Sequence, residues 1–143
     1  LTISKDGVVM ETLTDASDGY DYTPTDYGSY DVAYQCEDAS GNVATKKLAF
    51  TISDPVSPTL TFASAVPTSA KLGDKLTLPT YIINDNNPDT VEVYASYISP
   101  NGARASIDDG TITFTEKGLY VIHYLVVDAN DNYQLYTFNV MVA

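Results

Sequence analysis

The chain has 143 residues, and its 19 acidic and 7 basic residues give a formal net charge of −12 at pH 7. An acidic surface of this kind repels nucleic acid and anionic membranes, which excludes both as partners, and it suits a soluble exported or surface protein. The single cysteine, Cys36, rules out an internal disulfide, and no apolar run approaches the roughly 20 residues of a transmembrane helix, so no membrane insertion is expected. Because the sequence begins at Leu1 without a signal peptide, we expect it to be a piece of a longer protein.

In chain order, the first clear element is a β-hairpin. Apolar and polar residues alternate from Tyr30 to Cys36, and the alternation returns from Leu48 to Ile52. A period of two predicts strands with one buried face, so Cys36 is predicted to be a small core residue. Between the two strands lies Asp-Ala-Ser-Gly-Asn at 38–42, whose Asx and glycine residues favour a turn.

A linker and a second set of strands follow. The linker is predicted at 53–58, Ser-Asp-Pro-Val-Ser-Pro, because two prolines are incompatible with a central strand. Short alternating segments predict strands at 59–62, 75–79, 91–98, 103–107 and 111–115. No segment has the periodicity of a helix.

The end of the chain repeats the first hairpin. Residues 28–53 align without a gap with residues 118–143, at an offset of 90. Identical pairs include Gly28/Gly118, Tyr30/Tyr120, Tyr34/Tyr124, Asp38/Asp128 and Asn42/Asn132. The second turn, Asp-Ala-Asn-Asp-Asn at 128–132, resembles the signature with which cadherins hold calcium between domains. Here a strand of about ten residues follows it, as in the first hairpin, so a turn between paired strands is predicted.

Both hairpins begin with an acidic residue, a glycine and a tyrosine, ending at Tyr30 and Tyr120. This spacing resembles the tyrosine corner of Greek-key sandwiches, in which the hydroxyl bonds backbone while the ring joins the core. The predicted fold is all-β, with tandem immunoglobulin-like (Greek-key) β-sandwiches: a partial domain at 1–53, strands C to G, and a complete domain at 54–143.

The first domain is predicted to lack its first two strands. Counting back by 90 aligns Leu1 with Val91, so residues 1–4, 8–13 and 20–24 are the predicted strands before the hairpin. A sandwich without two strands leaves part of its core open to water. We expect preceding sequence or a neighbouring chain to supply them.

A family resemblance covers residues 28–143, and weakly 1–27. The pattern Gly-x-Tyr-x-Val-x-Tyr-x-x-x-Asp-Ala-x-Gly-Asn, with the upstream LGDKLTLPTYIINDN, resembles hyalin repeats and related bacterial Ig-like repeats. The resemblance implies stalks, spacers or adhesive modules in large secreted or surface-anchored proteins, or decorations on phage particles. Eukaryotic hyalin repeats carry paired cysteines, and this chain has Cys36 alone, so the bacterial or phage branch fits better.

Calcium is the one cofactor considered. Candidate ligands lie in the linker, in the loop at 84–89 and in the second hairpin turn: Asp54, Asp85, Asp89, Asp128, Asn130 and Asp131. In an immunoglobulin-like sandwich these loops meet at one end, and calcium takes six to eight such oxygen ligands. The alternative is that Asn, Asp and Pro are present simply because they form turns.

The outward face of the repeated hairpin changes character between the two copies. Its side chains are polar in the first copy and largely apolar in the second. The predicted protein-interface residues are Tyr94, Ile98, Leu119, Val121, His123, Leu125 and Leu135. A contiguous apolar patch usually marks a contact surface. The alternative is scattered surface apolar residues, or cover by a loop.

The sequence predicts that the chain is not an enzyme. Its only histidine, His123, lies within a strand with no sign of a nucleophile beside it, and the carboxylates are scattered. The predicted function is a structural or adhesive module of a larger extracellular or cell-surface bacterial protein, contacting a protein partner or neighbouring repeats. One alternative is a phage or virion decoration protein. Another is a carbohydrate-binding module, in which tyrosines such as Tyr20, Tyr22 and Tyr27 would stack on sugars.

Overall fold

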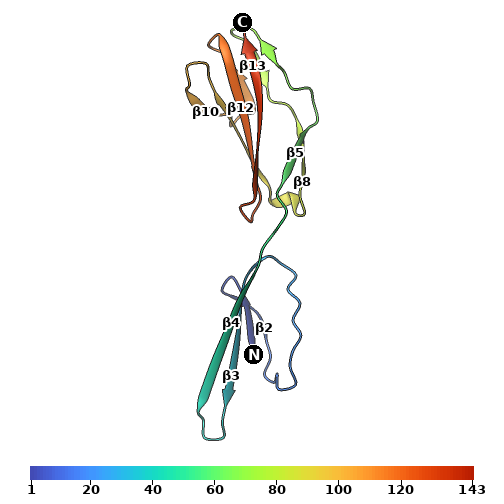
Figure 1. Cartoon of the computed structure of the whole chain (residues 1–143), viewed down its shortest axis with the longest axis vertical. Coiled ribbons are helices and arrows are strands. Elements are labelled where there is room, and N and C mark those ends of the chain that lie inside the picture. The colour runs from blue at the N-terminus through green and yellow to red at the C-terminus, as the bar shows by residue number, and fades with distance from the viewer. The chain divides into compact units, whose positions relative to one another are not determined.

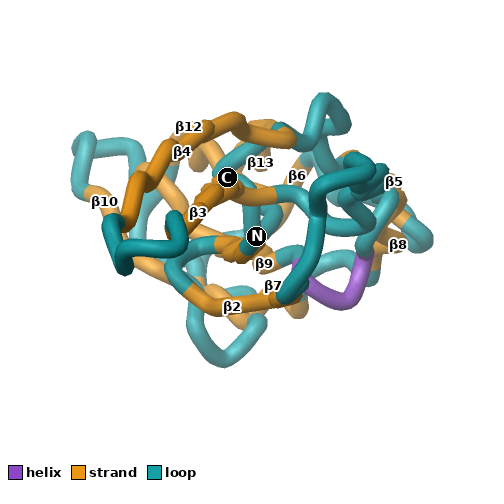
Figure 2. Tube along the Cα trace, turned by 90° about the horizontal axis from the view of Figure 1, so that it is seen from below, coloured by secondary structure: helices purple, strands orange, loops and turns teal.

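A computed structural model describes all 143 residues, which form two compact units, unit 1 (Leu1–Asp54) and unit 2 (Pro55–Ala143). The boundary between them lies in the predicted linker. Strands dominate both units, and the one helical turn is η1 (Pro88–Thr90), drawn purple in Figure 2. No helix is long and apolar enough to cross a membrane. The prediction of an all-β chain is confirmed.

Unit 1 is a four-stranded antiparallel sheet in the order β2-β1-β3-β4 (Figure 1). Its strands are β1 (Thr2–Lys5), β2 (Val8–Thr12), β3 (Gly28–Glu37) and β4 (Val43–Ile52). The last two pair over their whole length, from Gly28 opposite Ile52 to Glu37 opposite Val43. The first predicted hairpin is therefore confirmed.

The strand predicted at 20–24 is absent. Its counterpart in unit 2, β11 (Thr111–Thr113), pairs with β7 (Lys75–Thr77). Unit 1 has no counterpart of β7, so residues 20–24 have no strand to pair with, and backbone polar groups need partners. The segment instead packs through Tyr22, whose ring centroid lies 6.1 Å from that of Tyr30.

Strand β1 is displaced by four residues from its predicted alignment with unit 2. Ile3 pairs with Val32, whereas Ile122, the equivalent of Val32, pairs with Tyr97 of β9 (Glu92–Ile98). Ile3 therefore corresponds to Tyr97, at an offset of 94 rather than 90. A shift by an even number of residues keeps every side chain on the same face, so the alternating pattern cannot reveal it.

Unit 2 contains a five-stranded sheet, β10-β9-β12-β13-β6, and two two-stranded sheets, β11-β7 and β5-β8. The remaining bounds are β5 (Thr59–Phe62), β6 (Ser69–Ala70), β8 (Tyr81–Asn84), β10 (Arg104–Ser106), β12 (Gly118–Val127) and β13 (Tyr133–Val142). Strand β12 pairs antiparallel with β9 and β13, and β6 joins β13 in parallel. The predicted strand at 75–79 ends earlier, as β7, and the short β6 and β8 were not predicted.

The core of unit 2 is built from both the five-stranded sheet and the shorter sheets. Alternate residues of β12 are almost fully buried: Tyr120, Ile122, Tyr124 and Val126. They cluster with Leu60 of β5 and Ile112 of β11. Burying a large apolar side chain contributes about 1.5–3 kcal/mol, so this row of contacts is the main attraction between the sheets.

The two repeated tyrosines occupy the same buried corner. The Tyr30 hydroxyl donates to the carbonyl of Asp26 at 2.8 Å. The Tyr120 hydroxyl accepts from the backbone N–H groups of Thr115 and Glu116, at 3.2 and 3.1 Å. Both rings are 1% exposed. The tyrosine-corner prediction is thus confirmed, because each hydroxyl satisfies backbone groups four or five residues upstream.

We expect Tyr120→Phe to lower the free energy of unfolding of unit 2 by about 0.5–1.5 kcal/mol, because two partly buried backbone N–H groups lose their acceptor. Calorimetry would show this as a fall in the melting temperature of that unit. Tyr124→Phe is the matched control: its hydroxyl is buried without a hydrogen-bond partner, so removing it should be neutral or stabilising. Equal losses in both variants would contradict the role assigned to the corner.

Candidate functional site

The pentapeptide turn is organised by its first aspartate. In unit 2, Asp128 Oδ1 accepts from the backbone N–H groups of Asn130 and Asn132, at 2.8 and 2.9 Å, and Oδ2 accepts from Asn132 Nδ2 at 2.8 Å. In unit 1, Asp38 makes the same three bonds with Ser40 and Asn42, at 2.8, 2.9 and 2.8 Å. The motif is therefore a hairpin turn in both copies, with the carboxylate as its acceptor.

These hydrogen bonds shift the titration of both carboxylates in the same direction. Burial alone would raise the pKa of Asp128, but the bonds from Asn132 and Asn130 outweigh it and hold that pKa below its ordinary value. The pKa of Asp38 is lowered chiefly by the hydrogen bond from the Asn42 side chain. Both turns are therefore most stable when their aspartates are ionised.

The remaining candidate calcium ligands lie in both units. Asp54 ends unit 1 and is buried. In unit 2, Asp85 Oδ1 accepts from Asn87 N at 2.8 Å, while its Oδ2 is buried and accepts no hydrogen bond. Asp89 is exposed in η1, and Asp131 adopts a left-handed turn conformation with φ of +65°.

The structure favours turn chemistry for these residues. Both oxygens of Asp128 are already used within its turn. No group of three or more His, Cys, Asp or Glu side chains is placed to hold a metal ion. Calcium binding stays a prediction that the melting experiment below tests.

The predicted interface residues lie on one face of the five-stranded sheet. Leu125 lies between Tyr94 of β9 and Leu135 of β13 in the strand register. Two rows further along, Val121 lies opposite Ile98. Tyr94 and Leu135 are 54% and 57% exposed. This outward face, defined by the seven predicted residues, therefore places apolar side chains side by side across three strands.

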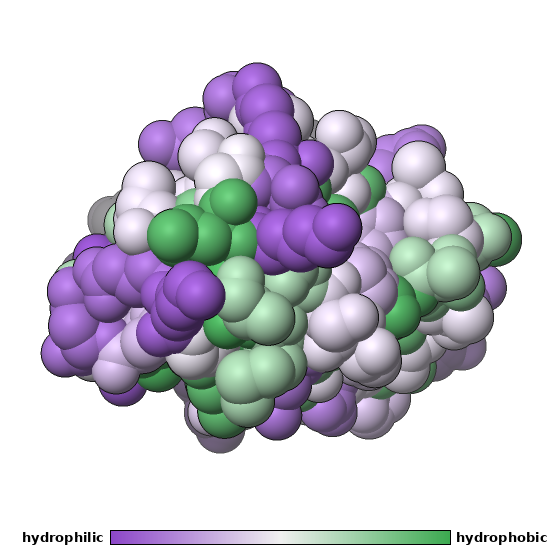
Figure 3. All heavy atoms as spheres, turned by 90° about the horizontal axis from the view of Figure 1, so that it is seen from above, coloured by the Kyte–Doolittle hydropathy of each residue, from purple (hydrophilic) through white to green (hydrophobic).

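The outward face extends beyond the predicted residues. Leu119 lies opposite Met141, and Val127 lies opposite Tyr133, which is 64% exposed. Tyr133 was missed, although it continues the same alternation along β13. Figure 3 views unit 2 from the end where the chain finishes and shows hydrophobic residues, in green, reaching the surface between polar ones.

A polar row crosses the middle of this face. His123 lies between Ser96 and Thr137, and its Nδ1 is 3.1 Å from Thr137 Oγ1. Its Nε2 is buried and has no hydrogen-bond partner. His123 thus contacts a threonine of the neighbouring strand, as expected for a residue on the surface of the sheet.

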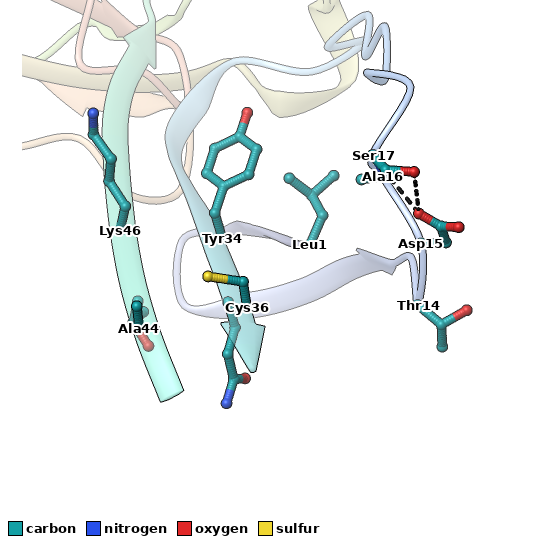
Figure 4. Close-up of a pocket in the computed structure, with 11 residues that line it drawn as sticks. Leu1, Thr14, Asp15, Ala16, Ser17, Tyr34, Cys36, Ala44 and Lys46 are labelled. Atoms are coloured by element: carbon teal, nitrogen blue, oxygen red, sulfur yellow. Dashed lines mark hydrogen bonds between the residues drawn. The ribbon is translucent and has the colours of Figure 1, made fainter. Parts of the chain in front are cut away.

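The inward face of the hairpin in unit 1 is open, which corrects one prediction. Cys36 was predicted to lie in the core, but it is exposed because no second layer covers this end of β3. A cavity of about 420 Å³ borders it, also lined by Leu1 and Tyr34. In Figure 4, Leu1 lies between Tyr34 and the segment that carries Asp15 and Ser17.

The tyrosines considered for sugar binding are held by neighbours in unit 1. The Tyr20 hydroxyl donates to Glu11 at 2.5 Å, and Tyr20 is exposed. Tyr22 and Tyr27 are half-buried, and Tyr22 packs near Tyr30. Sugar binding through them stays a prediction.

Comparisons with known proteins add no family to this geometry. No family model matches the sequence, and no curated protein matches it. The resemblance to hyalin-type and bacterial Ig-like repeats therefore stays a prediction.

We expect Asp128→Ala to lower the free energy of unfolding of unit 2 by about 1–3 kcal/mol, because three donors lose a charged acceptor. The loss should be the same in calcium and in EDTA, measured as melting temperature. Asp38→Ala is the matched variant in unit 1, where water replaces the lost bonds more easily because the turn is exposed. A calcium-dependent rise in the melting temperature of the unaltered chain, absent from Asp128→Ala, would establish the calcium site instead.

The pH dependence of stability follows from the lowered pKa values. A carboxyl whose pKa is lower in the folded state contributes stability above its unfolded pKa, about 3.9, and loses it as the pH falls through the folded value. The melting temperatures of unit 1 and unit 2 should therefore both fall as the pH drops below about 4. Combining Asp38→Ala with Asp128→Ala should flatten this decline. An unchanged acid profile in that double variant would show that other groups control it.

Proposed function

We propose that this chain is a non-catalytic structural or adhesive module made of immunoglobulin-like repeats. The strand order of unit 2 supports the fold assignment. In this assignment β5 is strand A, β7 and β8 together are strand B, and β11 is strand E. Strands β9, β10, β12 and β13 are C, C′, F and G. The incomplete unit 1 corresponds to the part of such a sandwich that begins within strand C.

One observation carries the functional proposal: the outward face of β9, β12 and β13 is apolar, while the same face in unit 1 is polar. Val121 and Leu125 correspond to Asp31 and Gln35 of unit 1, ninety residues earlier. Most inward positions of the hairpin are apolar in both units, so the change from polar to apolar is concentrated on this outward face. An apolar patch that spans three strands usually marks a protein contact.

The proposed partner is protein, in the form of neighbouring repeats or subunits. A row of half-buried aliphatic side chains around Val121 offers shape and apolar area, and the net charge of −12 disfavours nucleic acid and anionic membrane. Such a module belongs in a larger extracellular or cell-surface bacterial protein. The same face would dock on other subunits if the parent is a virion protein.

We expect the double variant Val121→Ser, Leu125→Ser to abolish concentration-dependent self-association, because it removes the centre of the outward face. Sedimentation velocity over a range of concentrations measures this. Asp31→Ser with Gln35→Ser changes the same two positions in unit 1 and should leave association unchanged. A monomeric unaltered chain at every concentration, or association that survives the first pair of changes, would contradict the proposal.

A further inference from the structure

The inward faces of the two hairpins differ sharply in burial, although most of their positions are apolar in both. Tyr34 is 43% exposed, whereas its equivalent Tyr124 is 1% exposed. Phe50 is 39% exposed, and its equivalent Val140 is fully buried. Leu48, between them on the sheet, is exposed as well. Apart from Tyr30, which is buried, unit 1 thus exposes much of the row of side chains that forms the core in unit 2.

Unit 2 shows what covers this row. The ring of Phe62, from β5, packs edge-on against Tyr124 at 5.2 Å, and Tyr81, from β8, packs against the same ring at 5.9 Å. The backbone N–H of Leu60 donates to the Tyr136 hydroxyl at 3.0 Å. All the covering residues from β5 to β8 lie within 55–94, and unit 1 contains no counterpart of that segment.

Unit 1 also has an open strand edge next to its open face. In unit 2, Glu92–Ala95 of β9 pair with Tyr124–Val127 of β12. In unit 1, β1 pairs with β3 only as far as Ala33, so Tyr34–Glu37 are paired with β4 alone. The cavity of about 420 Å³ lies at this end of the sheet. An unpaired edge beside an apolar face is the arrangement that accepts an added strand.

We propose that unit 1 is a strand acceptor for a segment of the type of residues 55–94. Its last strand pairs antiparallel with Gln35–Glu37, as Glu92–Tyr94 pairs with Leu125–Val127 in unit 2. Its earlier strands lie over Tyr34, Leu48 and Phe50. The occupant is an extended polypeptide. Only strands can both pair with the backbone donors and acceptors of the open edge and cover the flat apolar row beside it.

Lys46 determines which polar group the occupant places next to it. Lys46 lies opposite Tyr34, where unit 2 has Tyr136 opposite Tyr124. Tyr136 accepts a hydrogen bond from the covering strand, whereas a lysine ammonium has three donors and no acceptor. The segment that binds unit 1 therefore presents a carbonyl or carboxylate oxygen to Lys46 where Leu60 presents an N–H.

The register dictates a fusion that tests this inference. Leu1 corresponds to Ala95, so a second copy of residues 55–94 joined directly to Leu1 places each added strand without a linker. The readout is the rate at which Cys36 reacts with Ellman's reagent, relative to its rate in the urea-unfolded chain. The thiol is exposed now, and its equivalent, Val126, is fully buried. We expect the fusion to slow labelling on the order of tenfold or more, because reaction then requires local opening.

Two variants of the fusion serve as controls. Leu60→Asp with Phe62→Asp, in the added copy only, removes the covering side chains and should restore the fast rate of the chain alone. Lys46→Tyr restores the acceptor found in unit 2 and should slow labelling further.

Labelling of the fusion at the rate of the unfused chain would overturn the proposal. So would labelling of the unfused chain that slows as its concentration rises, because a second copy would then be covering the face. The outward face of β12 takes no part in this experiment, so its outcome is independent of the proposed function.

Discussion

Two requirements determine the structure of both units: strand edges need hydrogen-bond partners, and apolar faces need a covering layer. The repeated hairpin shows the effect of each. The hairpin itself is complete in each unit, with ten residues of β3 paired to β4 and ten of β12 paired to β13. Backbone pairing within a hairpin supplies no second layer. Where 55–94 provides that layer, Tyr124 and Val126 become core residues, and where it is missing, Tyr34 and Cys36 face water. The same alternating pattern therefore yields opposite burial, because burial is decided by the partner layer.

The turn and the corner show which parts of the hairpin are locally determined. Asp38 and Asp128 make the same three hydrogen bonds within four residues of themselves, in an exposed turn and in a partly buried one. Tyr30 and Tyr120 likewise bond backbone four or five residues upstream. These motifs form without the covering layer, since all their partners lie on the same stretch of chain. The turns fix the register of the two strands of each hairpin through local hydrogen bonds.

That distinction explains how far the sequence could predict the structure. Alternation, turn residues and the 90-residue repeat were sufficient for both hairpins, the corner and the outward face, because each depends on local chemistry or on period two. The strand predicted at 20–24 failed since a strand needs a partner that unit 1 does not contain. The four-residue displacement of β1 keeps every side chain on its predicted face, so no pattern could expose it. The exposure of Cys36 depends on the covering layer, which its own alternating row cannot encode.

The two faces of the hairpin compare differently between the units. The inward row is aromatic and aliphatic in both units, at Tyr30 and Tyr34 as at Tyr120 and Tyr124, although only one unit covers it fully. The outward row differs, with Asp31 and Gln35 in one unit and Val121 and Leu125 in the other. In unit 2 the inward row is constrained by packing in the core. The apolar inward row of unit 1 supports the proposal that a layer of strands covers it. An outward row is free to change without disturbing the fold, so its apolar character in unit 2 supports the proposed contact surface.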